Sequence, residues 1–235
     1  MAKKRRWGMG LLWRAVLLAV GGVLLLQLWF LAHIFWWIDH NPTTTAYMED
    51  RLQVLREKNS QAVLQQRWVP YNRISSSLKR AVIAAEDAKF LDHEGFDWEG
   101  IQKALEKNVK RGRIVAGGST ISQQLARNLF LSGERSWWRK AQEAAITLMI
   151  EAVMSKRRIL EIYLNVVELG DGVYGAEAAA RHYFSLSAAS LSEEQAAFLA
   201  SILPRPRYYD RNRATPFLTR KMETIRARMP SAVLP

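Results

Sequence analysis

RAVIAAEDAKFLDHEGFDW, residues 80–98, places two adjacent carboxylates, Glu86 and Asp87, in an otherwise apolar helical pattern. Val82 and Phe90 stand four residues before and after Glu86, so a helix through this stretch would put Glu86 on the stripe that faces the core. A buried carboxylate without a cation at a neighbouring helical position has a raised pKa, which suits a general acid or base. A structural acid satisfied by a hydrogen-bond network would give the same pattern, and this stretch alone does not separate the two interpretations.

The first forty residues indicate a membrane anchor. Residues 15–38 contain no Asp, Glu, Lys or Arg, and as a helix they are about 36 Å long, enough to cross a hydrocarbon core of about 30 Å. A cleaved signal peptide is the alternative, but its apolar region would be only about 7–15 residues long and would end in small residues. Cations precede the run, so the positive-inside rule places residues 1–14, a basic segment, in the cytoplasm. The expected protein is single-pass in the cytoplasmic (inner) membrane, with its remainder in the periplasm or another extracytoplasmic space.

The composition narrows the classes of function. The chain has no cysteine, which excludes disulfides, thiolate metal sites and a cysteine nucleophile. Its formal net charge is +12, and 29 Lys and Arg against 22 Asp and Glu leave +7 after the five N-terminal cations. A basic domain beside a bilayer predicts anionic head groups or pyrophosphates as partners. No nucleic-acid-binding motif occurs, so nucleic acid is not an expected partner.

The exterior part of the chain has helical periodicity throughout and almost no strand-like alternation, which predicts a mainly α fold. Thr120 with Gln123, and Ser192 with Gln195, fit capping boxes at helix starts. The expected domain organisation is a linker or stalk over residues 39–65 and a catalytic domain over residues 66–235. Helices are predicted over residues 46–66, 76–90, 98–110, 120–131, 137–155, 156–165, 174–183, 192–202 and 215–228.

A second candidate site is VAGGSTISQQLARNLFL, residues 115–131, where paired glycines precede Ser119 and Thr120 and a helix start that carries Gln124. Glycines allow close approach of the backbone, and a helix N-terminus favours anions such as phosphate. The segment is not a Walker loop, because the Gly-Lys-Thr/Ser ending is missing. An ordinary capped helix after a flexible turn is the alternative, and the segment taken alone favours that alternative.

A third candidate lies in ERSWWRKAQEAAITLMIEAVMSKRRILEIYLN, residues 134–165. Arg139 and Lys140 stand about one helical turn before Glu143. A carboxylate with cations beside it is typical of sites for glycosyl or pyrophosphate chemistry, although an ion-paired surface helix has the same spacing. Glu151 lies on the same helical face as Glu143, which makes it a competing candidate for the second acid.

Five segments follow one another in the exterior part: EDAKFLDHEGFD (86–97), GGSTISQQLARNLFL (117–131), RKAQEA (139–144), SKRRILEIYLN (155–165) and GVYGAEAAARHYF (172–184), the last followed by LPRPRYY (203–209). Any one of them is weak evidence. In this order and behind an anchor, they resemble the five motifs of the bacterial peptidoglycan glycosyltransferases, over about residues 66–212. The length leaves no room for the transpeptidase domain of the bifunctional members, so the resemblance is to the monofunctional ones.

The resemblance implies a lysozyme-like, mainly α glycosyltransferase domain behind one N-terminal transmembrane helix. Such an enzyme polymerises lipid II into linear glycan strands, with transfer to the 4-hydroxyl of N-acetylglucosamine, inversion at the sugar carbon and release of undecaprenyl diphosphate. The implied partners are lipid II, the growing glycan strand and the bilayer, with proteins of cell-wall synthesis and division as further candidates.

The motifs also imply roles for individual residues. Glu86 would be the general base, and Glu143 would assist the leaving diphosphate directly or through a divalent cation, Mg²⁺ or Mn²⁺. No tightly bound cofactor is expected. The other residues expected at the substrate are Arg127, Arg139 and Lys140 for charge, Ser119, Thr120 and Gln124 for hydrogen bonds, and Asp87, Phe90 and His93 as support for Glu86.

Two rival functions remain open at this point: a lysozyme-like hydrolase of the same polymer, which also needs a carboxylate in a helical domain, and a non-catalytic membrane scaffold. The anchor and the basic cluster disfavour the hydrolase, and the presence of both motif acids disfavours the scaffold. A flap that dips into the membrane interface is expected around Leu129, Phe130, Leu131, Trp137 and Trp138, with packing in the core as the alternative.

Overall fold

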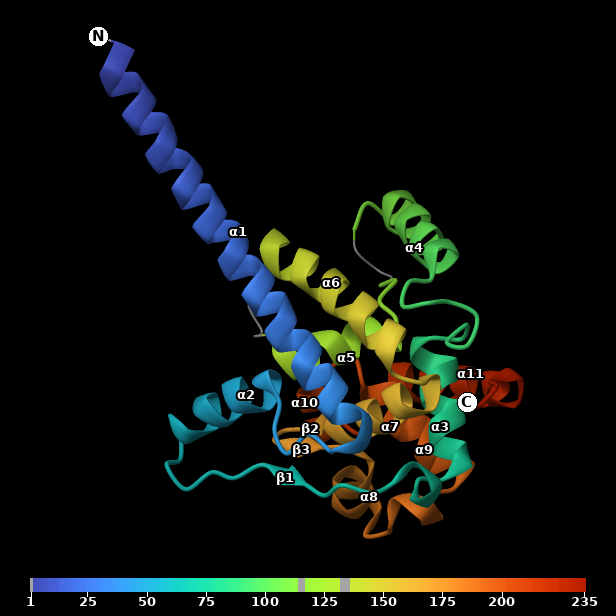
Figure 1. The fold of residues 1–235 in the computed structure, drawn as a ribbon. Helices are drawn as coiled ribbons and strands as arrows, with labels where there is room; N and C mark the ends of the chain where they lie inside the picture. The colour runs from blue at the N-terminus through green and yellow to red at the C-terminus, as the bar shows by residue number, and fades with distance from the viewer. Residues whose placement is uncertain (1, 114–116, 132–135) are drawn as a thin grey trace.

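The computed structural model describes residues 2–113, 117–131 and 136–235, and their side chains except at residues 2–9, 11 and 12. One long helix, α1 (Ala2–Asp39), extends out of an otherwise compact helical body (Figure 1). The first helices of that body are α2 (Ala46–Arg56), α3 (Ser76–Glu86), α4 (Trp98–Arg111), α5 (Ile121–Phe130) and α6 (Trp137–Val153). They are followed by α7 (Lys156–Val166), α8 (Ala176–Phe184), α9 (Glu193–Ile202), α10 (Pro206–Arg211) and α11 (Pro216–Arg228), with short 3-10 turns at Tyr71–Arg73, Ala188–Ser190 and Met229–Ser231. The expected mainly α fold is confirmed.

A small sheet accompanies the helices. It consists of β1 (Gln65–Gln66), β2 (Glu168–Gly170) and β3 (Val173–Tyr174) in the order β1-β3-β2. β1 pairs with β3 in parallel, and β2 pairs with β3 antiparallel. Strands of two or three residues are too short to show alternation, so periodicity gave no sign of this sheet.

The core of the body forms around α9, which packs between α3 and α11. Small and apolar side chains of α9 are buried there, among them Ala196, Leu199 and Ala200. Ser192 and Gln195 form the expected capping box at the start of α9, and Thr120 and Gln123 form the one at the start of α5. These caps fix the N-termini of two helices whose faces are then buried.

The domain end of α1 is docked on the body. Phe30 and Ile34 are buried, and Gln27 donates a hydrogen bond from Nε2 to Oε1 of Gln142 on α6 at 2.8 Å. Phe130, the last residue of α5, has its ring centroid 5.0 Å from that of Phe30. The anchor therefore packs against the helices that carry two of the candidate motifs.

The chain just after the anchor is also held by the body. The Arg158 guanidinium of α7 donates to the carbonyl oxygens of Trp37 and His40 and to Oδ1 of Asn41. Because these contacts hold the exit of α1, the helix leaves the body in a defined direction.

The segment predicted as a linker or stalk, residues 39–65, contains α2 and lies on the body. Thr45 caps α2, Met48 is buried, and Arg51 forms an ion pair with Asp171. α2 packs against α5. The predicted boundary at residue 65 therefore marks no gap in packing between a stalk and the body.

The helix that carries Glu86 ends earlier than its pattern indicates. The prediction extends to residue 90, but α3 ends at Glu86, and Asp87 leaves the helical region with φ −161° and ψ 73°. Phe90 is still buried, because the chain turns back on itself after Asp87. The inference that a helical stripe places Glu86 next to Phe90 is therefore wrong, and Glu86 instead stands at the C-terminal end of α3.

Candidate active site

Glu86 is half-buried and is held by an amide. Gln124 of α5 donates from Nε2 to Oε2 of Glu86 at 2.9 Å, and its own Oε1 accepts the hydroxyl of Tyr163 at 3.0 Å. Since the buried tyrosine fixes which end of the amide is the acceptor, Gln124 presents its NH₂ group to the carboxylate. Gln124, which was expected to hydrogen-bond the substrate, is bonded here to Glu86 and Tyr163.

The surroundings raise the pKa of the Glu86 carboxyl above its usual value. Burial is the largest cause, because it disfavours the charged form, and the negative charge of Asp87 adds to it. The hydrogen bond from Gln124 and the positive charges of Lys221 and Arg127 act in the opposite direction. A carboxylate whose pKa is raised in this way accepts a proton more readily than an exposed glutamate, as a general base requires.

Asp87 joins two motifs rather than facing an open site. It is buried, its Oδ2 accepts the backbone N–H of Ile121 at the start of α5 at 3.0 Å, and its Oδ1 lies 2.9 Å from Nε2 of His93. The backbone N–H of Gly95 donates to Nδ1 of His93 at 3.1 Å, so Nε2 carries the hydrogen that His93 donates to Asp87. Asp87 and His93 therefore support Glu86 by fixing α3 to α5.

The segment after the paired glycines is held by the same turn that contains His93 and Gly95. Thr120 is buried, and its hydroxyl donates to the carbonyl oxygen of Gly95 at 2.7 Å while accepting from the backbone N–H of Gln123. Gly95 has φ +95°, and a Cβ there would lie 2.8 Å from Cγ2 of Thr147, so only glycine suits this position. The Thr120 hydroxyl, expected to bind substrate, is instead used to fix the turn, whereas Ser119 remains half-buried beside it.

Glu143 is a second acid, and it is buried beside two cations. Lys140 pairs with its Oε1, and Nη1 of Arg139 lies 3.3 Å from its Oε2. The Nε of Arg139 is buried with no hydrogen-bond partner in the described part of the chain. The α6 cluster of Arg139, Lys140 and Glu143 thus contains a buried N–H donor, unpaired among the described residues, beside the half-exposed ammonium of Lys140.

Glu151, the competing candidate, is used in packing. It accepts the hydroxyl of Ser122 on α5 and the ammonium of Lys156, which lies 2.7 Å away. The same Lys156 ammonium donates to the carbonyl oxygen of His93 and lies 4.7 Å from the ring centroid of the buried Phe90. Glu151 therefore links α5 and α6, and through Lys156 also the loop after α3.

Arg127 lies one turn after Gln124 on α5, and its charge lowers the pKa of Glu86. Within the described residues no carboxylate lies within 4.0 Å of its guanidinium, so Arg127 forms no ion pair there. A half-buried arginine close to Glu86 and without an ion-pair partner in the described part of the chain is suited to bind an anionic part of a substrate.

Two residues beside Glu86 were not among the site residues expected from the sequence. Tyr163 orients Gln124, and burial raises its pKa well above the usual value. Lys221 of α11 is half-buried and donates to the carbonyl oxygen of Ser201 at 3.0 Å, and burial lowers its pKa while the charge of Glu86 opposes that shift. Tyr163 lies within a quoted motif and could have been found there, but nothing in the sequence around Lys221 connects it with Glu86.

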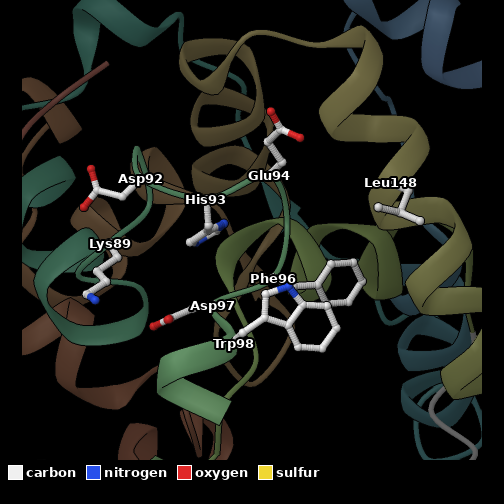
Figure 2. A pocket seen from close by; sticks show the side chains of 8 residues that line it. All are labelled: Lys89, Asp92, His93, Glu94, Phe96, Asp97, Trp98 and Leu148. Atoms are coloured by element: carbon white, nitrogen blue, oxygen red, sulfur yellow. The ribbon is translucent and has the colours of Figure 1, made fainter. Parts of the chain in front are cut away.

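An open cavity of about 570 Å³ adjoins the His93 turn (Figure 2). Phe96 and Trp98 stack on its wall, with ring centroids 5.3 Å apart, and Leu148 of α6 lies across from them. Lys89, Asp92, Glu94 and Asp97 supply its charged lining. The half-buried Phe96 ring and the exposed Trp98 ring, next to charged groups, form a surface that can bind a sugar.

The expectation of a divalent cation at Glu143 has little support from the donor set. Among the described residues no group of three or more His, Asp or Glu side chains is arranged to hold a metal ion. Glu143 is the one carboxylate of the α6 cluster, so a Mg²⁺ or Mn²⁺ ion there would take most of its ligands from a diphosphate and water.

The helical body carries a carboxylate with a raised pKa and a cluster of cations. This pair suits a general-base reaction in which a group is transferred from an anionic leaving group to an acceptor. Comparison with known families agrees, since residues 52–230 match the family described as transglycosylase. The chain therefore belongs to the transglycosylase family and is a glycosyltransferase, which confirms the resemblance of its five motifs.

The relatives match over nearly the whole chain. The chain is 59% identical over 231 residues to the biosynthetic peptidoglycan transglycosylase of Nitrosospira multiformis, covering 98% of this chain and 99% of that protein. It is 61% identical over 225 residues to the protein of the same name from Methylobacillus flagellatus, covering 96% and 98%. A third similar protein of this name, from Dechloromonas aromatica, is 62% identical over 216 residues, covering 92% and 94%.

The electrostatic contact between Lys221 and Glu86 predicts a shift in pH dependence. Lys221 lowers the pKa of Glu86, so in Lys221→Met that pKa rises and the base is protonated up to a higher pH. The acidic limb of the kcat/KM profile should therefore move to higher pH. Lys221→Arg, which keeps the charge, should leave the limb in place, and an unmoved limb in Lys221→Met would contradict the assignment.

Proposed function

We propose that this transglycosylase polymerises lipid II into peptidoglycan strands, with Glu86 as the general base. The 4-hydroxyl oxygen of the acceptor attacks the anomeric carbon of the donor, and its proton passes to Glu86. The bond between that carbon and the diphosphate oxygen breaks, and undecaprenyl diphosphate leaves with the electron pair. Attack opposite the leaving group inverts the configuration. The observation that carries the proposal is the half-buried Glu86, with its raised pKa and its bond to Gln124.

The α6 cluster is the proposed site of the leaving diphosphate. Arg139 and Lys140 would share their charge between Glu143 and the diphosphate, and Nε of Arg139 supplies a donor with no other described partner. Arg127 would complete the positive surroundings from α5. Charged groups that are already in position before the reaction stabilise the developing negative charge without having to move.

The docking of α1 supports the proposal that the enzyme meets its substrate at membrane level. The uncharged run begins at residue 15, and Gln27 makes the first hydrogen bond to the body among the described side chains of α1. Residues 15–26 account for only about 18 Å of helix, less than the about 30 Å of a hydrocarbon core. Part of the docked helix would then lie in the bilayer, which would bring Phe130 and Gln142 into contact with it.

The membrane-facing surface differs from the expected flap. Leu129 and Leu131 are buried, and Phe130 packs on the anchor, so these three belong to the core and to the α1 contact. Trp137 and Trp138 are 93% and 61% exposed at the start of α6. Tryptophan favours the membrane interface, which supports a bilayer contact for this pair.

α4 supplies a second apolar surface. It is amphipathic with no buried residue, and Trp98, Leu105 and Val109 are exposed along it. In Figure 1, α4 and the start of α6 lie on the side of the body from which α1 projects. The proposed bilayer contact therefore comprises α4, the first turn of α6 and the anchor, with the cytoplasm at the N-terminus of α1.

Glu86→Gln should abolish polymerisation of lipid II by the purified full chain. Glutamine keeps the size and accepts the bond from Gln124 but cannot take a proton, and loss of a general base lowers kcat by about 10²–10⁴-fold. Separation of polymer from monomer on a gel measures the effect, and the thermal unfolding midpoint checks the fold. Near-normal turnover by the folded variant would contradict the assignment. Wild-type protein that shortened added glycan strands and made no polymer would instead favour the hydrolase.

Glu143→Gln should lower kcat on the order of 10²-fold, whereas Glu151→Gln should lower it by less than about tenfold. The reason is that Glu143 sits between the cations of the proposed diphosphate site, while Glu151 bonds to Ser122 and Lys156 in packing. Both variants exchange a carboxylate for an amide on the same helix, so each serves as the control for the other. A larger loss in Glu151→Gln would place the diphosphate elsewhere.

Because the chain has no cysteine, a single Trp137→Cys variant can carry a fluorophore that lipid-borne nitroxides quench. In nanodiscs the label at position 137 should be quenched strongly. Val63→Cys is the matched control, since Val63 is also exposed but precedes β1, which lies away from the projecting part of α1 in Figure 1. Equal, weak quenching at both positions would remove the start of α6 from the membrane.

A further inference from the structure

Two cavities adjoin along α11, and we call them together the α11 groove. One, of about 380 Å³, lies between α9, α10 and α11, and the other, of about 370 Å³, lies between α3 and α11. Both are lined by Phe217 and Lys221, so they meet at these two side chains. Ala84 and Ala85, the residues just before Glu86, line the second cavity. The groove therefore begins beside the proposed general base.

The groove is lined by four cations: Arg205 in the first cavity, Arg220 and Arg228 in the second, and Lys221 in both. Neither cavity is lined by a carboxylate among the described residues. None of the four cations has a carboxylate within 4.0 Å in the part of the chain that the structure describes. By contrast, Arg207, Arg211 and Arg213 on and after α10 each pair with an acid. The positive charge of the groove is thus uncompensated within the described part of the chain.

The spacing of the polar side chains along the groove suits an extended peptide of a few residues. Arg220, Thr224 and Arg228 recur every fourth residue on α11 and share one face, about 12 Å from first to last. An extended peptide of about four residues has this length. Tyr208 and Phe217 are exposed at the other cavity and add flat apolar surface between the charges.

We propose that the α11 groove binds the carboxylates of the short peptide carried by the acceptor unit of the peptidoglycan precursor. This inference rests on the proposed function, in which Glu86 takes the proton of the acceptor hydroxyl. The peptide belongs to the same molecule as that hydroxyl, and the groove starts one residue from Glu86. Arginines bind carboxylates through paired N–H donors, so Arg220 and Arg228 would hold the peptide along α11.

The groove lies away from the places where the two other anionic groups, the diphosphate and the lipid head groups, are expected. The proposed diphosphate site lies on α6, and α11 packs on α9 and α3 rather than on α1 or α6. In Figure 1 the projecting part of α1 leaves at the upper left, whereas α11 lies at the right. Anionic lipid head groups are therefore the less favoured ligand of these cations.

The test compares two substrates and two variants of the full chain. The substrates are lipid II with free peptide carboxylates and lipid II in which these carboxylates are amides. The test variant is Arg220→Gln with Arg228→Gln, and Arg226→Gln is the matched control, an exposed arginine of α11 that lines neither cavity. Lys221 stays unchanged, because its charge acts on Glu86.

With the free-carboxylate substrate, the double variant should raise KM by about tenfold, with kcat within about twofold of the wild type, since two partly exposed charge contacts are lost. With the amidated substrate, the double variant and the wild type should have the same KM. Arg226→Gln should match the wild type with both substrates. The thermal unfolding midpoint of the double variant should be unchanged, because both side chains are exposed.

Three results would overturn the proposal: an unchanged KM in the double variant, an equal rise in KM for both substrates, or a rise that appears only in nanodiscs with anionic lipid, which would assign the groove to head groups. Polymerisation of both substrates with equal KM by the wild type would also overturn it and leave the proposed function intact. Failure of the wild type to make polymer from either substrate would instead contradict the proposed function itself.

Discussion

The hydrogen bonds of the Asp87 carboxylate hold the candidate site together. One oxygen accepts the first backbone N–H of α5 and the other accepts from His93, so a single buried side chain joins the end of α3 to the start of α5. The negative charge lies at a helix N-terminus, where the backbone N–H groups favour it. Because α5 also carries Gln124, this joint sets the distance between Gln124 and Glu86. The removal of one partner from such a buried network would leave the others unsatisfied, so the joint stabilises the site as a unit.

The elements that the sequence could predict are those set by local patterns. The capping residues Thr120 and Ser192 marked the starts of α5 and α9 correctly, since a cap depends on residues only three positions apart. The end of α3 was missed, because it depends on a bond between Asp87 and Ile121, which are 34 positions apart. The contribution of Lys221 was missed for the same reason. A side chain on the last long helix reaches Glu86 only through the tertiary packing of α11 beside α3.

The anchor illustrates a limit of composition as evidence. Its length and lack of charge predicted a span, and one helix, Trp13–Asp39, is long and apolar enough to cross a membrane. Composition gave no reason to expect that the helix is also a packing partner of the body. Gln27 and Phe30 are unremarkable in an apolar run, yet they contact α6 and Phe130. A polar residue such as Gln27 within a span is costly in lipid without a partner, and Gln142 supplies that partner.

The cations at the two proposed anion sites differ in whether an acid pairs with them. The two cations of the α6 cluster share one acid, Glu143, so the cluster keeps a net charge of +1 that an entering anion would neutralise. Among the described residues no acid pairs with the cations of the α11 groove, and a like-charged group of side chains is unfavourable in the folded state without a ligand. Since Lys221 belongs to that group and also lowers the pKa of Glu86, an anion bound in the groove would weaken its effect on the base. If Glu86 is the base and the groove binds the acceptor as proposed, occupation of the groove would raise the pKa of Glu86 and make proton uptake easier when the acceptor is in place.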